Sequence, residues 1–218
     1  MTQKLRALER GAEEQSTVAR IVEGLKRELI NGTLGPDTLI VESQIGLRFG
    51  VSKTPAREAL VRLSEMGFVT VLPGRGYTVT KLSWQQIKDL FEARLLLECS
   101  AIELAAARAS ADDIAALKAA AVLPKKKSLS IEGLLDANLR FHTAIWKATR
   151  NERLVAMLRE IMDDLMRAMH TAMLSEDTSQ MVEQHLQLTD LIVRKDAAGT
   201  RAAMSEHVDT TRHRLLGL

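Results

Sequence analysis

The chain has 218 residues, of which 46% are hydrophobic and 3% aromatic. It can therefore form one large or two modest domains, and its composition favours helices over sheets. The formal net charge of +2 does not by itself indicate a nucleic-acid partner. The sequence shows no apolar run of membrane-spanning length and no signal-peptide core, which argues against a membrane or secreted protein and predicts a cytoplasmic one. The single cysteine, Cys99, excludes an intrachain disulfide.

The first predicted elements are an arm and a helix. Residues 1–15 are polar and charged; they could form a frayed helix or a flexible arm, and we predict the arm. A helix is expected to begin at Ser16 or Thr17 and to end at the C-cap signal Asn31-Gly32. Apolar residues at helical spacing define its buried face: Val18, Ile21, Val22, Leu25 and Leu29.

Two short helix patterns then meet at a turn, 49–52. Gly50 tolerates a left-handed turn conformation, and Ser52 is a good N-cap for the second helix. Pro55 falls in the first turn of that helix, where its missing N–H removes no hydrogen bond. Lys53 and Arg57 lie opposite an apolar face, which comprises Ala56, Ala59, Leu60 and Leu63. This pattern predicts a helix-turn-helix whose second helix fits the major groove of DNA.

A β-hairpin is predicted directly after the second helix. Residues 68–72 and 77–80 read as strands, and Pro73-Gly74-Arg75-Gly76 reads as the turn between them. Such a hairpin is a wing, and Arg75 at its tip could reach a phosphate or the minor groove. The alternative is that these cations only form a solvated surface.

The same residues resemble a known family. The runs VSKTPAREAL at 51–60, GFV at 67–69 and PGRG at 73–76 look like the winged helix of GntR-type bacterial repressors, and the resemblance covers about residues 16–80. Lys53 stands where arginine is commoner, so a bidentate guanine contact becomes a point-charge contact. Gly46 should cost its helix roughly 1 kcal/mol relative to alanine. The resemblance implies DNA contacts at Lys53, Thr54, Arg57, Gly74 and Arg75, and we add Ser43 and Ser52 to this candidate set.

After residue 81 the strand signals stop. Helices are predicted at 84–108, 112–122, 131–149, 152–174, 179–195 and 197–215, with a charged loop at 124–127. Short connections make antiparallel neighbours, so residues 81–218 should form a six-helix bundle. We therefore predict a mainly α protein with an N-terminal winged helix-turn-helix at 16–80, a small β-hairpin wing and a C-terminal all-α domain.

Three of the five histidines lie on apolar helix faces: His142, His185 and His207. Asn138 is one helical turn before His142 and faces the same way. Neutral imidazoles are common ligands of divalent metals, so three histidines and one oxygen could form a metal site inside the bundle. The alternative is that each is an ordinary core histidine.

Arg94 lies on the inner face of its predicted helix. A buried guanidinium needs an anionic partner. That partner could be Glu98, four residues later, or the carboxylate of a bound effector.

The second half of the chain also resembles a family. The runs FEARLLLE at 91–98, DANLRFHTAI at 136–145, EQH at 183–185 and MSEH at 204–207 look like the FCD ligand-binding domain of the FadR-type branch of GntR regulators. The resemblance implies a zinc, nickel or manganese ion bound by Asn138, His142, His185 and His207, with Arg94 joining them around the effector. Asn138 replaces the usual aspartate, and the loss of one negative charge should weaken metal binding.

We therefore expect a transcriptional repressor rather than an enzyme. It should bind a palindromic double-stranded operator as a homodimer and respond to a small carboxylate effector bound at a divalent metal. One alternative is the same regulator with a metal-free pocket. A second is a metal-dependent enzyme with a DNA-binding module, although no dedicated general base lies beside the proposed ligands.

Overall fold

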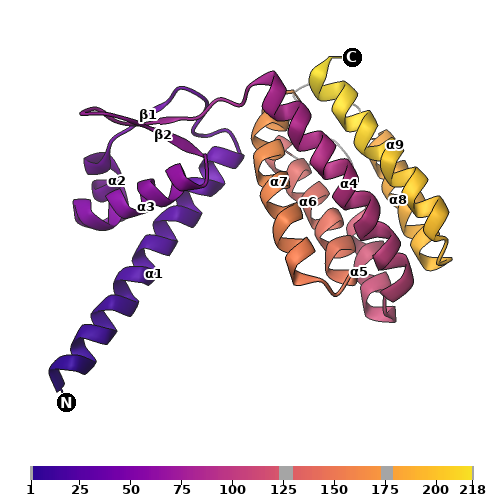
Figure 1. The fold of residues 1–218 in the computed structure, drawn as a ribbon, viewed down its shortest axis with the longest axis horizontal. Helices are drawn as coiled ribbons and strands as arrows, with labels where there is room; N and C mark the ends of the chain where they lie inside the picture. The colour runs from indigo at the N-terminus through magenta and orange to yellow at the C-terminus, as the bar shows by residue number, and fades with distance from the viewer. Residues whose placement is uncertain (1, 123–129, 173–178, 218) are drawn as a thin grey trace. The chain divides into compact units, whose positions relative to one another are not determined.

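The computed structural model describes residues 2–122, 130–172 and 179–217 (Figure 1). The chain divides into two compact units, residues 1–81 and 82–218. The predicted loop at 124–127 and the predicted helix end at 174 lie outside the described residues. Within the described ranges, no helix is both long and apolar enough to span a membrane.

The first unit contains a small sheet packed with helices. Its elements are α1 (Thr2–Ile30), β1 (Leu39–Ile40), α2 (Glu42–Phe49), α3 (Lys53–Glu65), β2 (Val69–Leu72) and β3 (Gly76–Val79). The antiparallel strand order is β1-β3-β2, and Val71 pairs with Tyr77 in the hairpin. The predicted wing is therefore present, and β1 adds a third strand to it that the sequence did not predict.

Residues 1–15 differ from the predicted flexible arm. Helix α1 begins at Thr2 and runs without a break to Ile30. The polar residues that suggested an arm, such as Lys4, Arg6 and Glu9, are also good helix formers. Their helix propensity favours the extension of α1.

The turn between α2 and α3 has the predicted backbone. Gly50 adopts φ 66° in the left-handed region, as expected for a helix C-cap. The Val51 N–H donates to the Gly46 carbonyl at 2.8 Å. A Cβ on Gly46 would lie 3.0 Å from the Val51 carbonyl oxygen, so this close approach explains a glycine inside α2.

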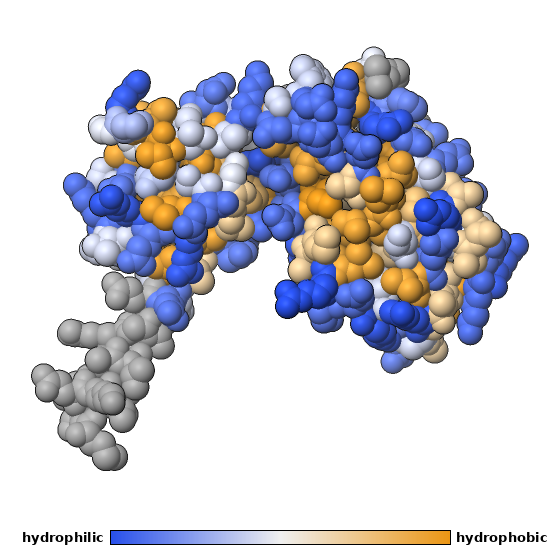
Figure 2. All heavy atoms as spheres, in the orientation of Figure 1, coloured by the Kyte–Doolittle hydropathy of each residue, from blue (hydrophilic) through white to orange (hydrophobic). Residues whose placement is uncertain are grey.

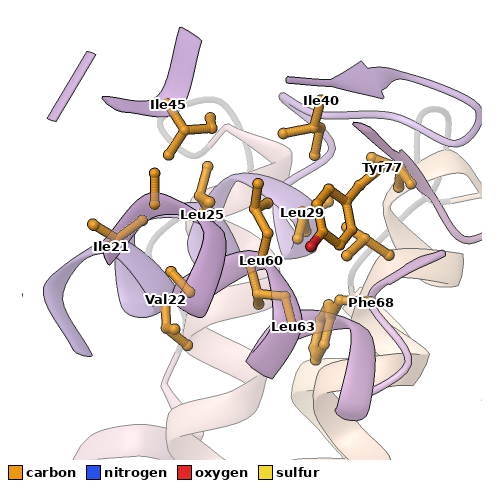
Figure 3. Packing of buried hydrophobic residues seen from close by; sticks show 14 of the residues in the cluster. Ile21, Val22, Leu25, Leu29, Ile40, Ile45, Leu60, Leu63, Phe68 and Tyr77 are labelled. Atoms are coloured by element: carbon orange, nitrogen blue, oxygen red, sulfur yellow. The ribbon is translucent and has the colours of Figure 1, made fainter. Parts of the chain in front are cut away.

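One hydrophobic cluster holds the first unit together (Figure 3). The predicted inner face of α1 is buried, and so is the apolar face of α3, whose Leu60 and Leu63 are fully enclosed. Ile40 from β1, Ile45 from α2 and Tyr77 from β3 complete the cluster. Because these residues come from every element of the unit, the cluster fixes α3 and the hairpin relative to each other.

The described part of the second unit consists of six helices, as predicted. They are α4 (Trp84–Arg108), α5 (Ala111–Ala121), α6 (Ile131–Ala148), α7 (Glu152–Ala172), α8 (Ser179–Val193) and α9 (Ala197–Leu216). Ser83 begins α4 with a capping box, in which its side chain accepts from the Gln86 N–H. Helix α4 packs against α6, α7, α8 and α9, and it runs antiparallel beside α9 (Figure 1).

Candidate functional site

The candidate DNA-contacting residues are all exposed on the first unit. Ser43 lies in α2, and Ser52 is the N-cap of α3. The others lie in the first turns of α3 or in the hairpin turn: Lys53, Thr54, Arg57, Gly74 and Arg75. The Ser52 side chain makes no capping hydrogen bond, so its hydroxyl stays available to solvent. The N-terminal turn of α3 therefore presents two cations and two hydroxyl groups.

Arg57 has a partner that sequence reasoning missed. Its Nε lies 3.7 Å from Oε1 of Glu42, and its side chain is 72% exposed. An exposed ion pair of this length contributes little to stability. The pair therefore holds the guanidinium only weakly near the start of α2. The sequence feature that could have indicated this pair is Glu42, an acidic residue in the first turn of α2.

Three histidines come together in the second unit. The ligating atoms of His142 in α6, His185 in α8 and His207 in α9 lie within 4.8 Å of one another, and all three residues are buried. Asn138 is buried one turn before His142 on α6. The structure therefore brings the histidines predicted from apolar helix faces into one cluster, whereas His213 is exposed.

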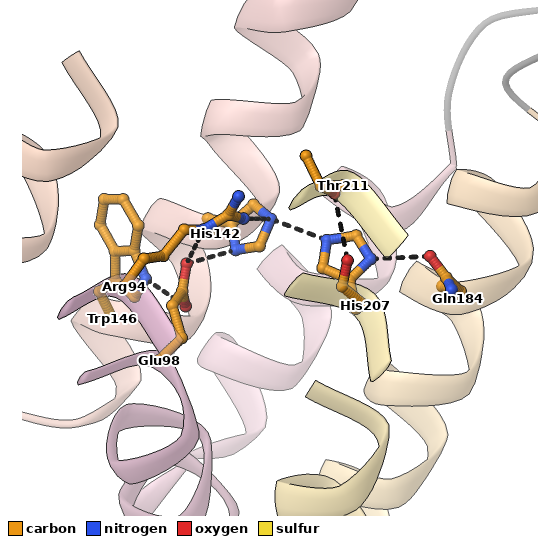
Figure 4. A network of polar contacts seen from close by, with 7 residues as sticks. All are labelled: Arg94, Glu98, His142, Trp146, Gln184, His207 and Thr211. Carbon is orange, nitrogen blue, oxygen red and sulfur yellow. Dashed lines mark hydrogen bonds and ion pairs between the residues drawn. The ribbon is translucent and has the colours of Figure 1, made fainter. Parts of the chain in front are cut away.

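Two of the imidazoles are oriented by acceptors on their outer side (Figure 4). His142 Nδ1 lies 2.9 Å from Glu98 Oε1, although the two atoms are not aligned for a hydrogen bond, and His207 Nδ1 donates to Gln184 Oε1 at 2.9 Å. The Gln184 amide nitrogen points to the Thr210 hydroxyl at 3.4 Å, which fixes the amide oxygen towards His207. Because Arg94 can only donate to His142 Nε2, and the Gln184 carbonyl oxygen can only accept from His207 Nδ1, we assign the ring proton to Nδ1 in both residues; the two Nε2 atoms lie 3.2 Å apart.

His185 is held differently. Its ring stacks on Phe141, with centroids 3.9 Å apart and an interplanar angle of 15°. Neither ring nitrogen has a hydrogen-bond partner. Burial, with the nearby His142 and Arg94, lowers the pKa of His185 to about 2. Burial also lowers the pKa of His207 well below its ordinary value, so both rings are neutral and able to donate a lone pair near pH 7.

The residues present fit a divalent metal. Two nitrogens bound to one tetrahedral zinc at about 2.0–2.1 Å lie roughly 3.3 Å apart. The observed separation of the His142 and His207 Nε2 atoms is 3.2 Å. His185 adds a buried nitrogen with no other partner, and Asn138 is a buried amide one helical turn before His142.

Glu98 is the centre of a buried network around the cluster. It lies beside His142 Nδ1, accepts from Trp146 Nε1 at 2.9 Å and lies 3.5 Å from Arg94 Nε. Burial acts to raise the pKa of Glu98, but His142, Arg94 and Trp146 together outweigh it and hold the pKa below its usual value. The sequence suggested Glu98 only as a partner of Arg94, because the contact with Trp146 joins helices that are distant in the chain.

Arg94 lies at the edge of the histidine cluster. It is 1% exposed, and its Nη2 lies 3.2 Å from His142 Nε2. Its Nη1 makes no hydrogen bond. Both readings from the sequence therefore have support: Arg94 faces Glu98 in its own helix, and it also carries a buried donor without a partner.

A winged helix-turn-helix joined to a helical unit with a buried polar cluster defines a DNA-binding regulator with a separate domain for a ligand. The family described as "Bacterial regulatory proteins, gntR family" matches residues 17–79, and the FCD domain family matches residues 89–210. This chain belongs to the GntR family of bacterial transcriptional regulators and carries a C-terminal FCD domain.

Individual relatives agree with this assignment. The "Uxu operon regulator" of Haemophilus influenzae is 30% identical, and the match covers 93% of this chain and 83% of that protein. The "HTH-type transcriptional repressor GlaR" of Escherichia coli is 31% identical over 85% of this chain and 90% of that protein. The solved structure of E. coli McbR/YncC has a TM-score of 0.80 at 23% identity and covers 91% of this chain and 96% of that one, so it shows the shared fold.

Proposed function

We propose that this regulator is a repressor whose binding to a palindromic operator is controlled by a small organic acid in the C-terminal domain. The observation that carries the proposal is the convergence of three buried imidazoles and one buried guanidinium at a single point between helices α4, α6, α8 and α9. A core with no ligand to bind gains little from such an arrangement, because each buried polar group costs free energy unless it is satisfied.

The DNA-binding role uses the exposed start of α3. Arg57 and Lys53 would reach base edges in the major groove, and the neighbouring hydroxyl groups would contact the phosphate backbone. Arg75, exposed in the turn of the wing, would add a contact beside the same groove. These contacts give the protein its position and its preference for one sequence.

One winged helix reads only a half-site, so we propose a symmetric dimer. Figure 2 shows hydrophobic residues gathered on the face of the C-terminal domain that carries α4. Leu96 of α4 is 63% exposed and lines a groove of about 370 Å³ together with Cys99 and, from α9, Ala198 and Ala202. The groove is also lined by Leu95, Arg201 and Ser205. An exposed leucine beside a groove that contains several small side chains suits a two-fold interface, in which each copy's Leu96 enters the other's groove.

We propose that His142, His185, His207 and Asn138 hold a zinc, nickel or manganese ion. FCD domains can bind a metal, and the donors in this chain fit one. A bound cation would supply positive charge and open positions for carboxylate oxygens. Arg94, whose Nη1 has no hydrogen bond, would hold the second side of the acid through a charge-assisted hydrogen bond.

One contact favours the alternative of a metal-free pocket. Arg94 Nη2 donates to His142 Nε2 at 3.2 Å, and Asn138 brings no negative charge. In that case Arg94 and the histidines would contact the acid directly. In either case the acid lifts repression only to the extent that it binds the DNA-incompetent arrangement of the dimer more tightly.

The test is elemental analysis of untagged protein purified without chelator. We expect about one zinc, nickel or manganese ion per chain, and its loss in the variant carrying His185→Ala and His207→Ala. The matched control is His213→Ala, an exposed histidine of α9. Wild-type protein that stays free of metal after reconstitution would favour the metal-free pocket, and metal retained by the double variant would disprove the ligand set.

A further inference from the structure

The buried cluster carries no net negative charge. Arg94, Glu98, Asn138, His142, His185 and His207 are each no more than 4% exposed. Arg94 and Glu98 offset each other, Asn138 is neutral, and an imidazole that offers a lone pair is neutral as well. A dication added to this set would leave two uncompensated positive charges inside the protein.

Glu98 does not face the ligating atoms. Its Oε2 accepts from Trp146 Nε1 at 2.9 Å, and its Oε1 lies 2.9 Å from His142 Nδ1 and 3.5 Å from Arg94 Nε. It therefore acts from behind His142 and polarises that ring. Among the described residues, the potential metal-ligating group contains His142, His185 and His207 and no carboxylate.

The positive charge of Arg94 lies beside the ligating atoms. Its Nη2 is 3.2 Å from His142 Nε2, the same nitrogen that lies 3.2 Å from His207 Nε2. A cation held by His142 and His207 must displace this donor and stand close to the guanidinium. Repulsion between like charges is strong at a buried site, because little solvent screens it.

From these contacts we infer that divalent metal and carboxylate bind this site interdependently, each raising the affinity for the other. The inference rests on the proposed function. The anion supplies the negative charge that the neutral Asn138 does not provide. It also gives Arg94 a partner once the metal has displaced Arg94 from His142 Nε2. By linkage, the factor by which the anion tightens metal binding equals the factor by which the metal tightens anion binding.

This coupling makes the protein a detector of two ligands at once. A metal that binds alone is repelled by the charge of Arg94. An acid that binds alone has no metal to coordinate its carboxylate oxygens. An aspartate at position 138 would supply the missing charge permanently, so the metal would then bind without the acid. The asparagine therefore shifts the regulator from constitutive to acid-dependent metal binding.

The experiment measures Ni²⁺ affinity of the full-length protein by isothermal titration calorimetry. Titrations in acetate and in lactate are each compared with perchlorate at equal ionic strength, after correction for the weak binding of the acids to free Ni²⁺. We expect at least one of the acids to tighten Ni²⁺ binding about tenfold or more, a typical coupling for two linked sites. Equal Ni²⁺ affinity in all three salts would overturn the inference and leave the metal site in place.

Two variants test the cause. Asn138→Asp should bind Ni²⁺ more tightly in perchlorate than wild type does and should lose most of the acid effect. Arg94→Gln removes the opposing cation. It should also tighten Ni²⁺ binding in perchlorate and reduce the effect of the acid. If both variants kept the full acid effect, the charge argument would be wrong. No Ni²⁺ binding by wild type in any salt would instead remove the metal from the proposed function itself, and this inference with it.

Discussion

The Nε2 atoms of His142 and His207 lie 3.2 Å apart, although the two residues are separated by 65 positions in the chain. We assign the proton of both rings to the other nitrogen, since Arg94 donates to His142 Nε2 and Gln184 accepts from His207 Nδ1. Two lone pairs that face each other at this distance repel, and Arg94 Nη2, which donates to His142 Nε2 at 3.2 Å, offsets only part of this repulsion. The geometry is therefore costly by itself and favourable for ligand binding.

Glu98→Gln should weaken metal binding about 10- to 100-fold, the usual effect of losing a carboxylate behind a ligating histidine. The glutamine can still accept from Trp146 and lie beside His142, so the change removes mainly the charge. A competition titration against a coloured chelator measures the affinity. Glu103→Gln is the matched control, because Glu103 lies on the same helix and pairs with Arg201 near the surface. Equal affinities in the two variants would remove Glu98 from the site.

Arg57→Ala should weaken specific operator binding by roughly 1–3 kcal/mol, the worth of one good base contact. The operator is first selected from random DNA with wild-type protein, and affinities are then compared by fluorescence anisotropy at one salt concentration. Arg62→Ala is the control, since Arg62 is an exposed arginine in the last turn of the same helix. If the two substitutions weaken binding equally, the start of α3 is not the reading surface.

The C-terminal domain should lose stability as pH falls below about 6.5. The folded pKa of His185 is lowered from 6.5 to about 2, mainly by burial, so the unfolded chain binds a proton that the folded one does not. The contribution of neutral His185 to the free energy of unfolding is fully present above the pKa of the unfolded chain. Below that pKa it falls by about 1 kcal/mol per pH unit. His207, lowered in the same direction, adds to the slope.

Urea unfolding between pH 7 and pH 5, followed by tryptophan fluorescence in chelator, measures this slope. His185→Gln should make it shallower by about one proton, whereas His213→Gln on the exposed side of α9 should leave it unchanged. A slope that His185→Gln does not alter would show that the buried ring takes up a proton in the folded state.

Gly46→Ala should destabilise the winged helix, although alanine favours a helix by about 1 kcal/mol. The new Cβ would lie 3.0 Å from the carbonyl oxygen of Val51, whose N–H is bonded to Gly46. Crowding against backbone should cost about 1–3 kcal/mol in a packed core. Thermal unfolding measures the effect. Gly35→Ala, where nothing lies within 4 Å, is the control; a higher melting temperature for Gly46→Ala would show that the turn yields easily.

Much of the fold follows from local signals. Helix α6 was expected at 131–149 and spans Ile131–Ala148, because Ser130 caps it and its apolar residues recur at helical spacing. Gly50 was expected in a left-handed turn and adopts it. Strand β1 was not predicted, and for residues 2–15 the flexible arm was preferred to the helix. A two-residue strand has no pattern of its own, and a polar helix has no apolar stripe to mark it.

The sequence by itself determined the winged helix-turn-helix, the helical second domain and the set of histidines on apolar faces, because these depend on spacing within single helices. Only the tertiary structure decided how the histidines are oriented. Glu98, Gln184 and Phe141 position the rings from three different helices, and contacts between helices leave no periodic trace in the chain. The tertiary structure also showed that Arg94 contacts both Glu98 and His142. The direction of its side chain depends on the packing around the buried charge, and its position in α4 alone does not determine it.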